Sequence, residues 1–117
     1  MNKYYHYYKY RGVAVFEILN ERLSVFNTPE IVYTFKRIIE DNEQPAIVID
    51  LKNVIHIDSV GIGFLIAIKN LSDKKGYENC LVCENELVSN MLKISKMENF
   101  FTIFSKLDEA VQWILRK

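Results

Sequence analysis

The chain has 117 residues, half of them hydrophobic, which is enough for one domain with a buried core. Lysine plus arginine and aspartate plus glutamate each number 15, so the formal net charge is zero and no basic excess indicates a nucleic-acid partner. The longest apolar runs are too short to span a membrane, and the first residues lack the apolar core of a signal peptide. We therefore expect a single cytoplasmic domain over 1–117 with no membrane insertion.

The chain opens with two predicted strands. Tyr4–Tyr10 is rich in tyrosine, Gly12 interrupts the pattern, and Val13–Leu19 is apolar, so the two segments are placed to pair as a hairpin. Asn20–Phe26 follows as a connection of undefined shape.

A helix start is predicted at Asn27-Thr28-Pro29-Glu30, which combines a capping residue, a proline in the first turn and an acidic residue. Apolar residues at helical spacing follow, and the helix is expected to end in Asp41–Pro45. Ala46–Leu51 is an almost continuous apolar run, which is typical of a central strand covered on both faces.

The second half of the chain continues the alternation. A helix is predicted from Ser59 to about Lys75, where Gly76 is a natural stop. The remaining predicted elements are a strand, a helix, a short strand and a terminal helix, over Asn79–Cys83, Leu87–Ile94, Phe100–Phe104 and Leu107–Ile114. This order predicts an α/β domain with a mixed, mainly parallel central sheet and about four helices.

Cys80 and Cys83 have the spacing of a redox pair or of half a zinc site. In a strand, however, side chains three residues apart point to opposite faces. The sequence holds no second cysteine pair, and its two histidines are distant along the chain. We expect two free, buried cysteines, no metal and no cofactor.

The segment Ile57–Gly63 carries the main functional signal. Asp58 and Ser59 are residue types that begin helices, and a hydroxyl at that position lies near unpaired backbone N–H groups and the positive end of the helix dipole. A phosphate would be tolerated there, so the position suits a reversible switch. Plain capping is the alternative. Gly61 and Gly63 are expected to permit close packing at the turn.

The sequence argues against two kinds of site, a hydrolase nucleophile and a dinucleotide-binding turn. A hydrolase nucleophile turn has glycine two residues before the serine, where this chain has Ile57, and neither His56 nor His6 is placed as an obvious base. The glycine pair also lacks the third glycine of a dinucleotide-binding fingerprint. We therefore expect no enzymatic activity.

Ile57-Asp58-Ser59-Val60-Gly61-Ile62-Gly63, set in this order of elements, resembles the STAS domain of anti-sigma factor antagonists. The resemblance extends from about Val13 to Val111 and includes the turn Met97–Phe101. It implies a partner switch, in which the unphosphorylated antagonist binds an anti-sigma factor that is also a serine kinase. The kinase phosphorylates the antagonist and a phosphatase restores it. By this resemblance Ser59 is the phosphoacceptor.

Two positions depart from the family's pattern. Val60 replaces a second serine or threonine, and Ser24, in Glu21-Arg22-Leu23-Ser24, stands where an aspartate is usual. That turn lies near the phosphoacceptor in the family, so Ser24 joins the expected partner-binding residues. The alternative function is an unphosphorylated STAS scaffold or accessory subunit of a signalling complex or a lipid transporter.

A helical projection completes the expected partner surface. Gly61, Phe64, Leu65, Ile68 and Leu71 fall on one side of the helix, which should face the sheet. Ile62 and Ile66 fall on the other side and are expected to form an exposed apolar patch. The expected partner-binding residues are Ser24, Asp58, Ser59, Val60, Gly61, Ile62, Gly63 and Ile66.

Overall fold

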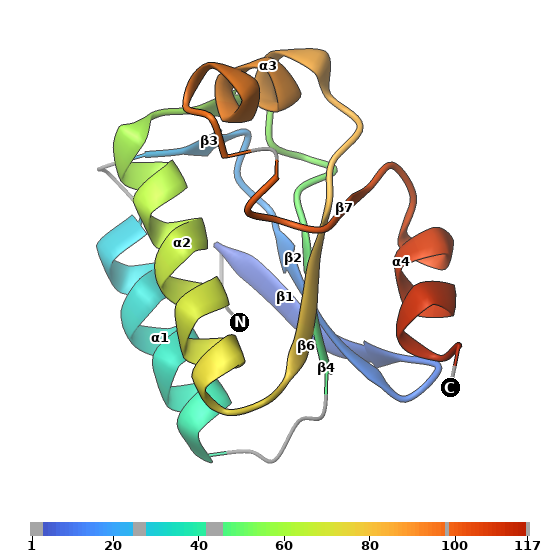
Figure 1. Cartoon of the computed structure of the whole chain (residues 1–117). Helices are drawn as coiled ribbons and strands as arrows, with labels where there is room; N and C mark the ends of the chain where they lie inside the picture. The colour runs from blue at the N-terminus through green and yellow to red at the C-terminus, as the bar shows by residue number, and fades with distance from the viewer. Residues whose placement is uncertain (1–3, 25–27, 42–45, 98, 117) are drawn as a thin grey trace.

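A computed structural model describes residues 4–24, 28–41, 46–97 and 99–116, and the molecule is an α/β fold (Figure 1). The strands and helices follow one another as β1 (Tyr5–Tyr10), β2 (Val13–Ile18), β3 (Arg22–Leu23), α1 (Thr28–Asp41), β4 (Ala46–Asp50), β5 (His56–Ile57), α2 (Ser59–Lys74), β6 (Glu78–Val82), α3 (Glu86–Ile94), β7 (Ile103–Phe104) and α4 (Leu107–Ile114). The expected cap Asn27 and the expected end of the first helix in 42–45 lie outside the described residues. No helix in the described ranges is long and apolar enough to cross a membrane.

The main sheet is mixed and mainly parallel, with the strand order β1-β2-β4-β6-β7. β1 and β2 form the predicted antiparallel hairpin, and every other neighbouring pair is parallel. The hairpin turn is Arg11-Gly12, in which both residues have positive φ angles of 53° and 83°. Two positive φ angles are the geometry of a tight hairpin turn whose twist matches that of the strands, which explains the glycine.

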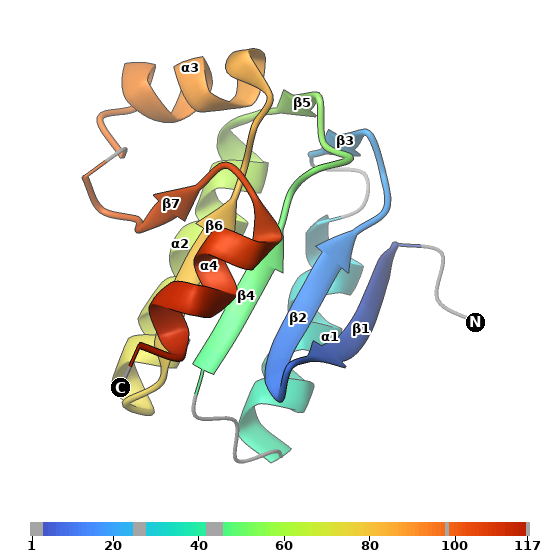
Figure 2. The same cartoon turned by 90° about the vertical axis from the view of Figure 1, so that its right-hand side faces the viewer.

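Helices cover both faces of the sheet, as Figure 2 shows. α1 and α2 pack on one face, and α4 packs on the other against β4, β6 and β7. The side chains of each strand alternate between the two layers, so Phe16, Ile47 and Leu81 join the α1/α2 core whereas Val15 and Val48 join the α4 core. The α/β prediction and the doubly covered central strand are therefore confirmed.

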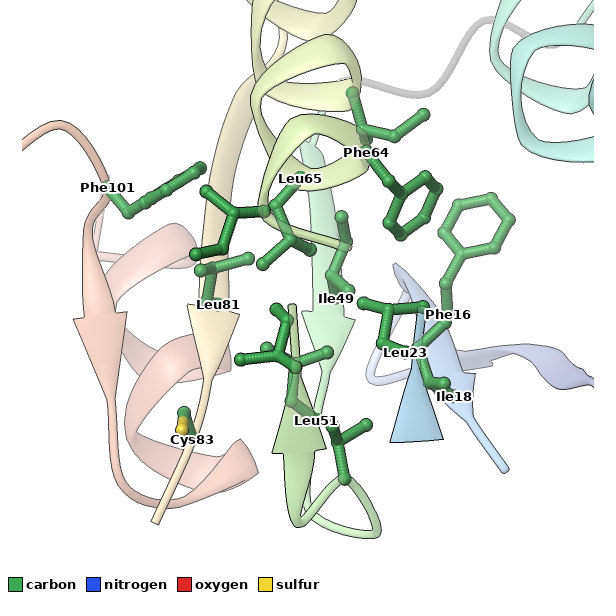
Figure 3. Close-up of a cluster of buried hydrophobic side chains, with 14 of the residues drawn as sticks. Phe16, Ile18, Leu23, Ile49, Leu51, Phe64, Leu65, Leu81, Cys83 and Phe101 are labelled. Atoms are coloured by element: carbon green, nitrogen blue, oxygen red, sulfur yellow. The ribbon is translucent and has the colours of Figure 1, made fainter. Parts of the chain in front are cut away.

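The larger core lies between the sheet and the α1/α2 layer (Figure 3). Phe16, Phe35 and Phe64 meet there from β2, α1 and α2, with ring centroids 4.1 Å apart for Phe16–Phe35 and 5.5 Å apart for Phe35–Phe64. Offset and edge-on contacts of this kind add to the burial free energy of the rings. This aromatic contact holds α2 against the sheet, so its amino end is firmly placed.

Two short strands were not predicted. β3 and β5 pair in parallel beyond the carboxyl end of β4 and form a small second sheet. In Figure 2 they lie side by side near α3, above the main sheet. Strands of two residues carry too little periodicity to be recognised, and their pairing joins segments more than 30 residues apart. The last strand is also shorter than predicted, because Phe101 turns into the core and Phe100 lies in a turn.

Candidate functional site

Ser59 is the first residue of α2, as the sequence predicted, and the structure shows it to be exposed. Asp58 is the N-cap, with an extended backbone, and its Oδ1 accepts hydrogen bonds of 3.0 Å from the N–H groups of Val60 and Gly61. Asp58 therefore satisfies two of the backbone donors that a helix start leaves unpaired. The Ser59 hydroxyl is left at the surface beside a carboxylate, at the positive end of a 16-residue helix.

The two motif glycines differ in their surroundings. A Cβ atom added to Gly61 would lie 2.3 Å from the Leu23 carbonyl oxygen and 2.7 Å from Cγ1 of Ile57, so only glycine fits. A Cβ atom on Gly63 would meet nothing within 4 Å. Close packing is thus confirmed for Gly61 and wrong for Gly63, which is exposed on the outer side of α2.

Gly61 allows β3 to lie directly against the start of α2. The backbone N–H of Asp58 donates to the Leu23 carbonyl over 3.4 Å, and the N–H groups of Ile55 and His56 both donate to the Glu21 carbonyl. The turn that contains Ser24 is therefore brought beside Ser59, although the two residues are 35 positions apart.

The backbone of Ser24 holds the first turn of α1. Its carbonyl accepts hydrogen bonds from both the backbone N–H and the hydroxyl of Thr28, at 3.0 and 2.5 Å, at the first turn of α1. The Ser24 side chain is buried rather than at the surface where a partner would meet it. The sequence could not predict this burial, because a serine in place of the usual aspartate does not indicate whether the side chain is buried or exposed.

The prediction that Ile62 and Ile66 form an exposed apolar patch on α2 is wrong. Ile62 is 6% exposed, and Ile66 is half-buried against the same core. The projection assumed that only the sheet covers α2, whereas α1 packs along the helix as well and β5 lies against its amino end. A helix covered by several elements buries a wider arc than the single stripe of a surface helix.

Exposed apolar side chains do lie at the end of the molecule that carries Ser59, but at the start of α2 and on α3. Val60 is exposed beside Ser59, and Leu87 and Ile94 project outward from α3, where Val88 and Leu92 face the core. α3 packs against β5, so this apolar face belongs to the same end of the sheet as Ser59. Sequence reasoning missed it because apolar residues occupy both sides of α3.

The remaining candidate chemistry lies away from Ser59. Cys80 and Cys83 are free and buried, and they join the α4 core and the α1/α2 core respectively, so they face opposite sides as predicted. Burial raises the pKa of the Cys80 thiol to about 12. Within the described ranges, no group of three histidine, cysteine, aspartate or glutamate side chains is placed to hold a metal ion. His6 lies on β1 with its Nδ1 3.9 Å from Oε1 of Glu17.

The sequence profile of the STAS domain family matches residues 4–110. Among solved structures, a putative anti-sigma factor antagonist from Thermotoga maritima shares 21% identity at a TM-score of 0.82, covering 97% of this chain and 95% of that one. The Bacillus cell fate determinant SpoIIAA in its phosphorylated form shares 13% identity at a TM-score of 0.70, covering 94% and 98%.

A sulfate transporter family protein from Wolinella succinogenes is also similar, with 18% identity, a TM-score of 0.74 and coverage of 88% of this chain and 84% of that one. Likeness at these identities establishes a shared fold. The match of the family profile over nearly the whole chain is the evidence for membership of a family.

Proposed function

Because the chain belongs to the STAS domain family, we propose that it is an anti-sigma factor antagonist that works as a partner switch. In this proposal the unphosphorylated protein binds an anti-sigma factor that is also a serine kinase, and so releases a sigma factor. The kinase then transfers the γ-phosphoryl group of ATP to Oγ of Ser59, and a phosphatase removes it. The protein works in the cytoplasm, is not itself an enzyme, needs no cofactor and binds no nucleic acid directly.

The observation that carries the proposal is the exposed Ser59 hydroxyl at the start of α2, beside the capping Asp58. A kinase needs a hydroxyl that it can reach, and phosphorylation needs a fold that tolerates the added charge. The helix dipole and the rigid attachment of α2 to the core supply that tolerance.

The added charge would act on the surface rather than on the fold. A phosphoserine carries about −1.5 to −2 charges at neutral pH, and here it would stand beside the Asp58 carboxylate. Bringing both charges into an interface would cost desolvation and repulsion, so partner binding should weaken while the domain stays folded. The residues that border Ser59 on this surface are Asp58, Val60 and Gly63. The start of α2 is held in place by two buried residues, Gly61 and Ile62.

The experiment compares Ser59→Ala with Ser59→Glu. Both variants should keep the wild-type melting temperature within a few degrees, since an acidic residue suits a helix start. Ser59→Ala should bind the purified kinase partner like the wild type, and Ser59→Glu should bind at least about 10-fold more weakly, as judged by calorimetry. Thr102→Glu adds the same charge at another exposed hydroxyl and should bind normally. Equal affinities of the alanine and glutamate variants would rule out a charge-gated surface.

A second candidate is a constitutive scaffold or accessory subunit, as in a signalling complex or a lipid transporter. Two observations favour it: Val60 leaves one hydroxyl at the helix start, and the Ser24 side chain is buried. Intact-mass analysis with phosphosite mapping, on protein taken from its own cells under several growth conditions, separates the two functions. A phosphate on Ser59 supports the switch, and its absence throughout supports the scaffold.

A further inference from the structure

The two edges of the main sheet differ in length. One edge is β7, a strand of only two residues, and the other is β1, a strand of six. In Figure 2, β1 lies at the right-hand edge of the main sheet, and no described helix or strand lies beyond it. Proteins usually protect an edge by making it short, bulged, covered or interrupted by proline. β7 is protected by its shortness, whereas β1 pairs with β2 in an unbroken register and contains no proline.

The hydrogen bonds of β1 show which of its backbone groups point away from the sheet. The Tyr4 carbonyl accepts a hydrogen bond of 2.9 Å from the Leu19 N–H, and the register of the hairpin continues this pairing along β1. In an antiparallel pair, residues that bond to the partner strand alternate with residues whose N–H and C=O groups point outward. The backbone groups of Tyr7 and Lys9 therefore point out of the sheet, where no described strand pairs with them.

The side chains of β1 match a second copy of the same strand. β1 carries two basic residues, four tyrosines and no acidic residue. When two copies pair antiparallel with Tyr8 on the two-fold axis, Tyr7 of one copy faces Lys9 of the other. His6 then faces Tyr10. Each Lys9 ammonium meets an aromatic ring, and no basic residue stands directly opposite another, whereas a register that paired Lys9 with Lys9 would oppose like charges.

Tyr8 is suited to lie on the two-fold axis. It is on the face of the sheet that α4 covers, but α4 packs against β4, β6 and β7 rather than centrally over β1. The Tyr8 ring stacks on His6, with centroids 4.8 Å apart, and is partly exposed. Across the axis, the two Tyr8 residues would form a non-hydrogen-bonded pair, which is the closer of the two cross-strand arrangements. Aromatic pairs at such positions stabilise a sheet.

We infer that two copies of the chain associate through β1, antiparallel and about a two-fold axis at Tyr8, so that their main sheets become one continuous sheet. Tyr7 and Lys9 of each copy exchange backbone hydrogen bonds with Lys9 and Tyr7 of the other. A surface that pairs with itself about a two-fold axis closes at two copies. One strand pair is a small interface, so we expect a dissociation constant on the order of 10–100 µM. This inference is independent of phosphorylation at Ser59, which lies on α2.

Amide hydrogen exchange followed by NMR tests the contact in the wild-type protein. Samples are compared at concentrations about 10-fold below and about 10-fold above the expected dissociation constant. The N–H groups of Tyr7 and Lys9 should exchange about four-fold more slowly in the concentrated sample, because they are bonded only in the dimer. The N–H groups of β7, at the other edge, should exchange at the same rate in both samples.

Two variants at one position separate the backbone from the side chain. Lys9→Pro removes the outward N–H but no hydrogen bond between β1 and β2, because that N–H takes no part in their pairing. It should raise the dissociation constant at least about 10-fold, as measured by sedimentation equilibrium. Lys9→Thr keeps the N–H and suits a strand, so its dissociation constant should stay within about three-fold of the wild-type value. If Lys9→Pro fails to fold, hydrogen exchange of the wild type decides.

Equal exchange rates of the Tyr7 and Lys9 amides in the two samples would overturn the inference, whether the protein is then a monomer or a dimer through another surface. A dimer that Lys9→Pro and Lys9→Thr weaken equally would also overturn it. Neither result bears on the proposed function, which the phosphorylation state of Ser59 decides.

Discussion

Asp50 is the residue whose surroundings are least expected for its type. It ends the central strand β4 with 1% of its surface exposed, on the face that α4 covers. Its Oδ1 accepts a hydrogen bond from the Lys52 N–H, while its Oδ2 is buried and has no hydrogen-bond partner among the residues that the structure describes. Glu17 is its register partner on β2. Burial raises the pKa of the Asp50 carboxyl, and the charge of Glu17 adds to the rise, against the opposing effects of Lys52.

This raised pKa predicts a pH-dependent loss of stability. Below the ordinary carboxyl pKa of 3.8, Asp50 is neutral in both the folded and the unfolded chain, so it costs nothing. As the pH rises through the raised pKa, the folded state must hold a buried charge, and the free energy of unfolding falls. Asp50→Asn should remove this fall and stabilise the protein at pH 7 by about 1 kcal/mol relative to its effect at pH 3.

Urea denaturation at a series of pH values measures this effect. Glu40→Gln neutralises an exposed carboxyl on α1 and serves as the control, for which a small and nearly constant difference is expected. An Asp50→Asn profile parallel to that of the wild type from pH 3 to pH 7 would contradict the assignment.

At the scale of elements, the candidate site depends on how α2 meets β3. The helix has α1 along one side and β5 at its amino end, which is why Ile62 is buried although the projection placed it outside. The two elements fit tightly at Gly61, where the Leu23 carbonyl oxygen leaves no room for a Cβ atom. This contact places the segment that contains Arg22 beside Ser59. A substitution at Gly61 should therefore affect both the stability of the domain and the proposed switch.

We predict that Gly61→Ala destabilises the domain and Gly63→Ala does not. The added methyl group at position 61 would lie 2.3 Å from a backbone oxygen, so β3 or α2 must shift, at a cost on the order of 2 kcal/mol. At position 63 the methyl group meets nothing, and alanine favours a helix by about 1 kcal/mol over glycine. Chemical denaturation of the two variants measures the difference, and equal stabilities would show that β3 does not contact the helix closely in solution.

At the scale of the molecule, two cores share one sheet. Cys80 belongs to the α4 core and Cys83 to the α1/α2 core, so the two thiols report on opposite faces. Both are buried and free, and burial raises the pKa of each thiol. A buried thiol reacts only when its surroundings open.

If the two cores unfold together, both thiols should react at the same rate with an aromatic disulfide reagent. We expect the rates for Cys80→Ser and Cys83→Ser, each with one remaining thiol, to agree within about a factor of three after correction for stability, and to rise together with urea. A Cys83 rate far above the Cys80 rate would show instead that the face carrying α2 and Ser59 opens separately.

Local signals in the sequence were sufficient for most of the architecture. Alternating and helical apolar patterns gave the main strands and all four helices, because burial of one face imposes a period of two on a strand and of 3.6 on a helix. Asp58 begins α2 as its residue type predicts, and Gly76 ends it with a φ of 76° that few other residues adopt readily. The position of Ser59 at the start of α2 follows from the same local rules.

The tertiary structure alone decided which residues surround Ser59. Several features of this site depend on contacts between segments that are distant in the chain. They are the pairing of β3 with β5, the tight fit at Gly61 but not at Gly63, the burial of Ile62, and the facing residues Arg22 and His56. The sequence shows only whether a residue is apolar, small or basic. Its depth and its neighbours depend on which elements pack over it, and those contacts exist only once the chain has folded.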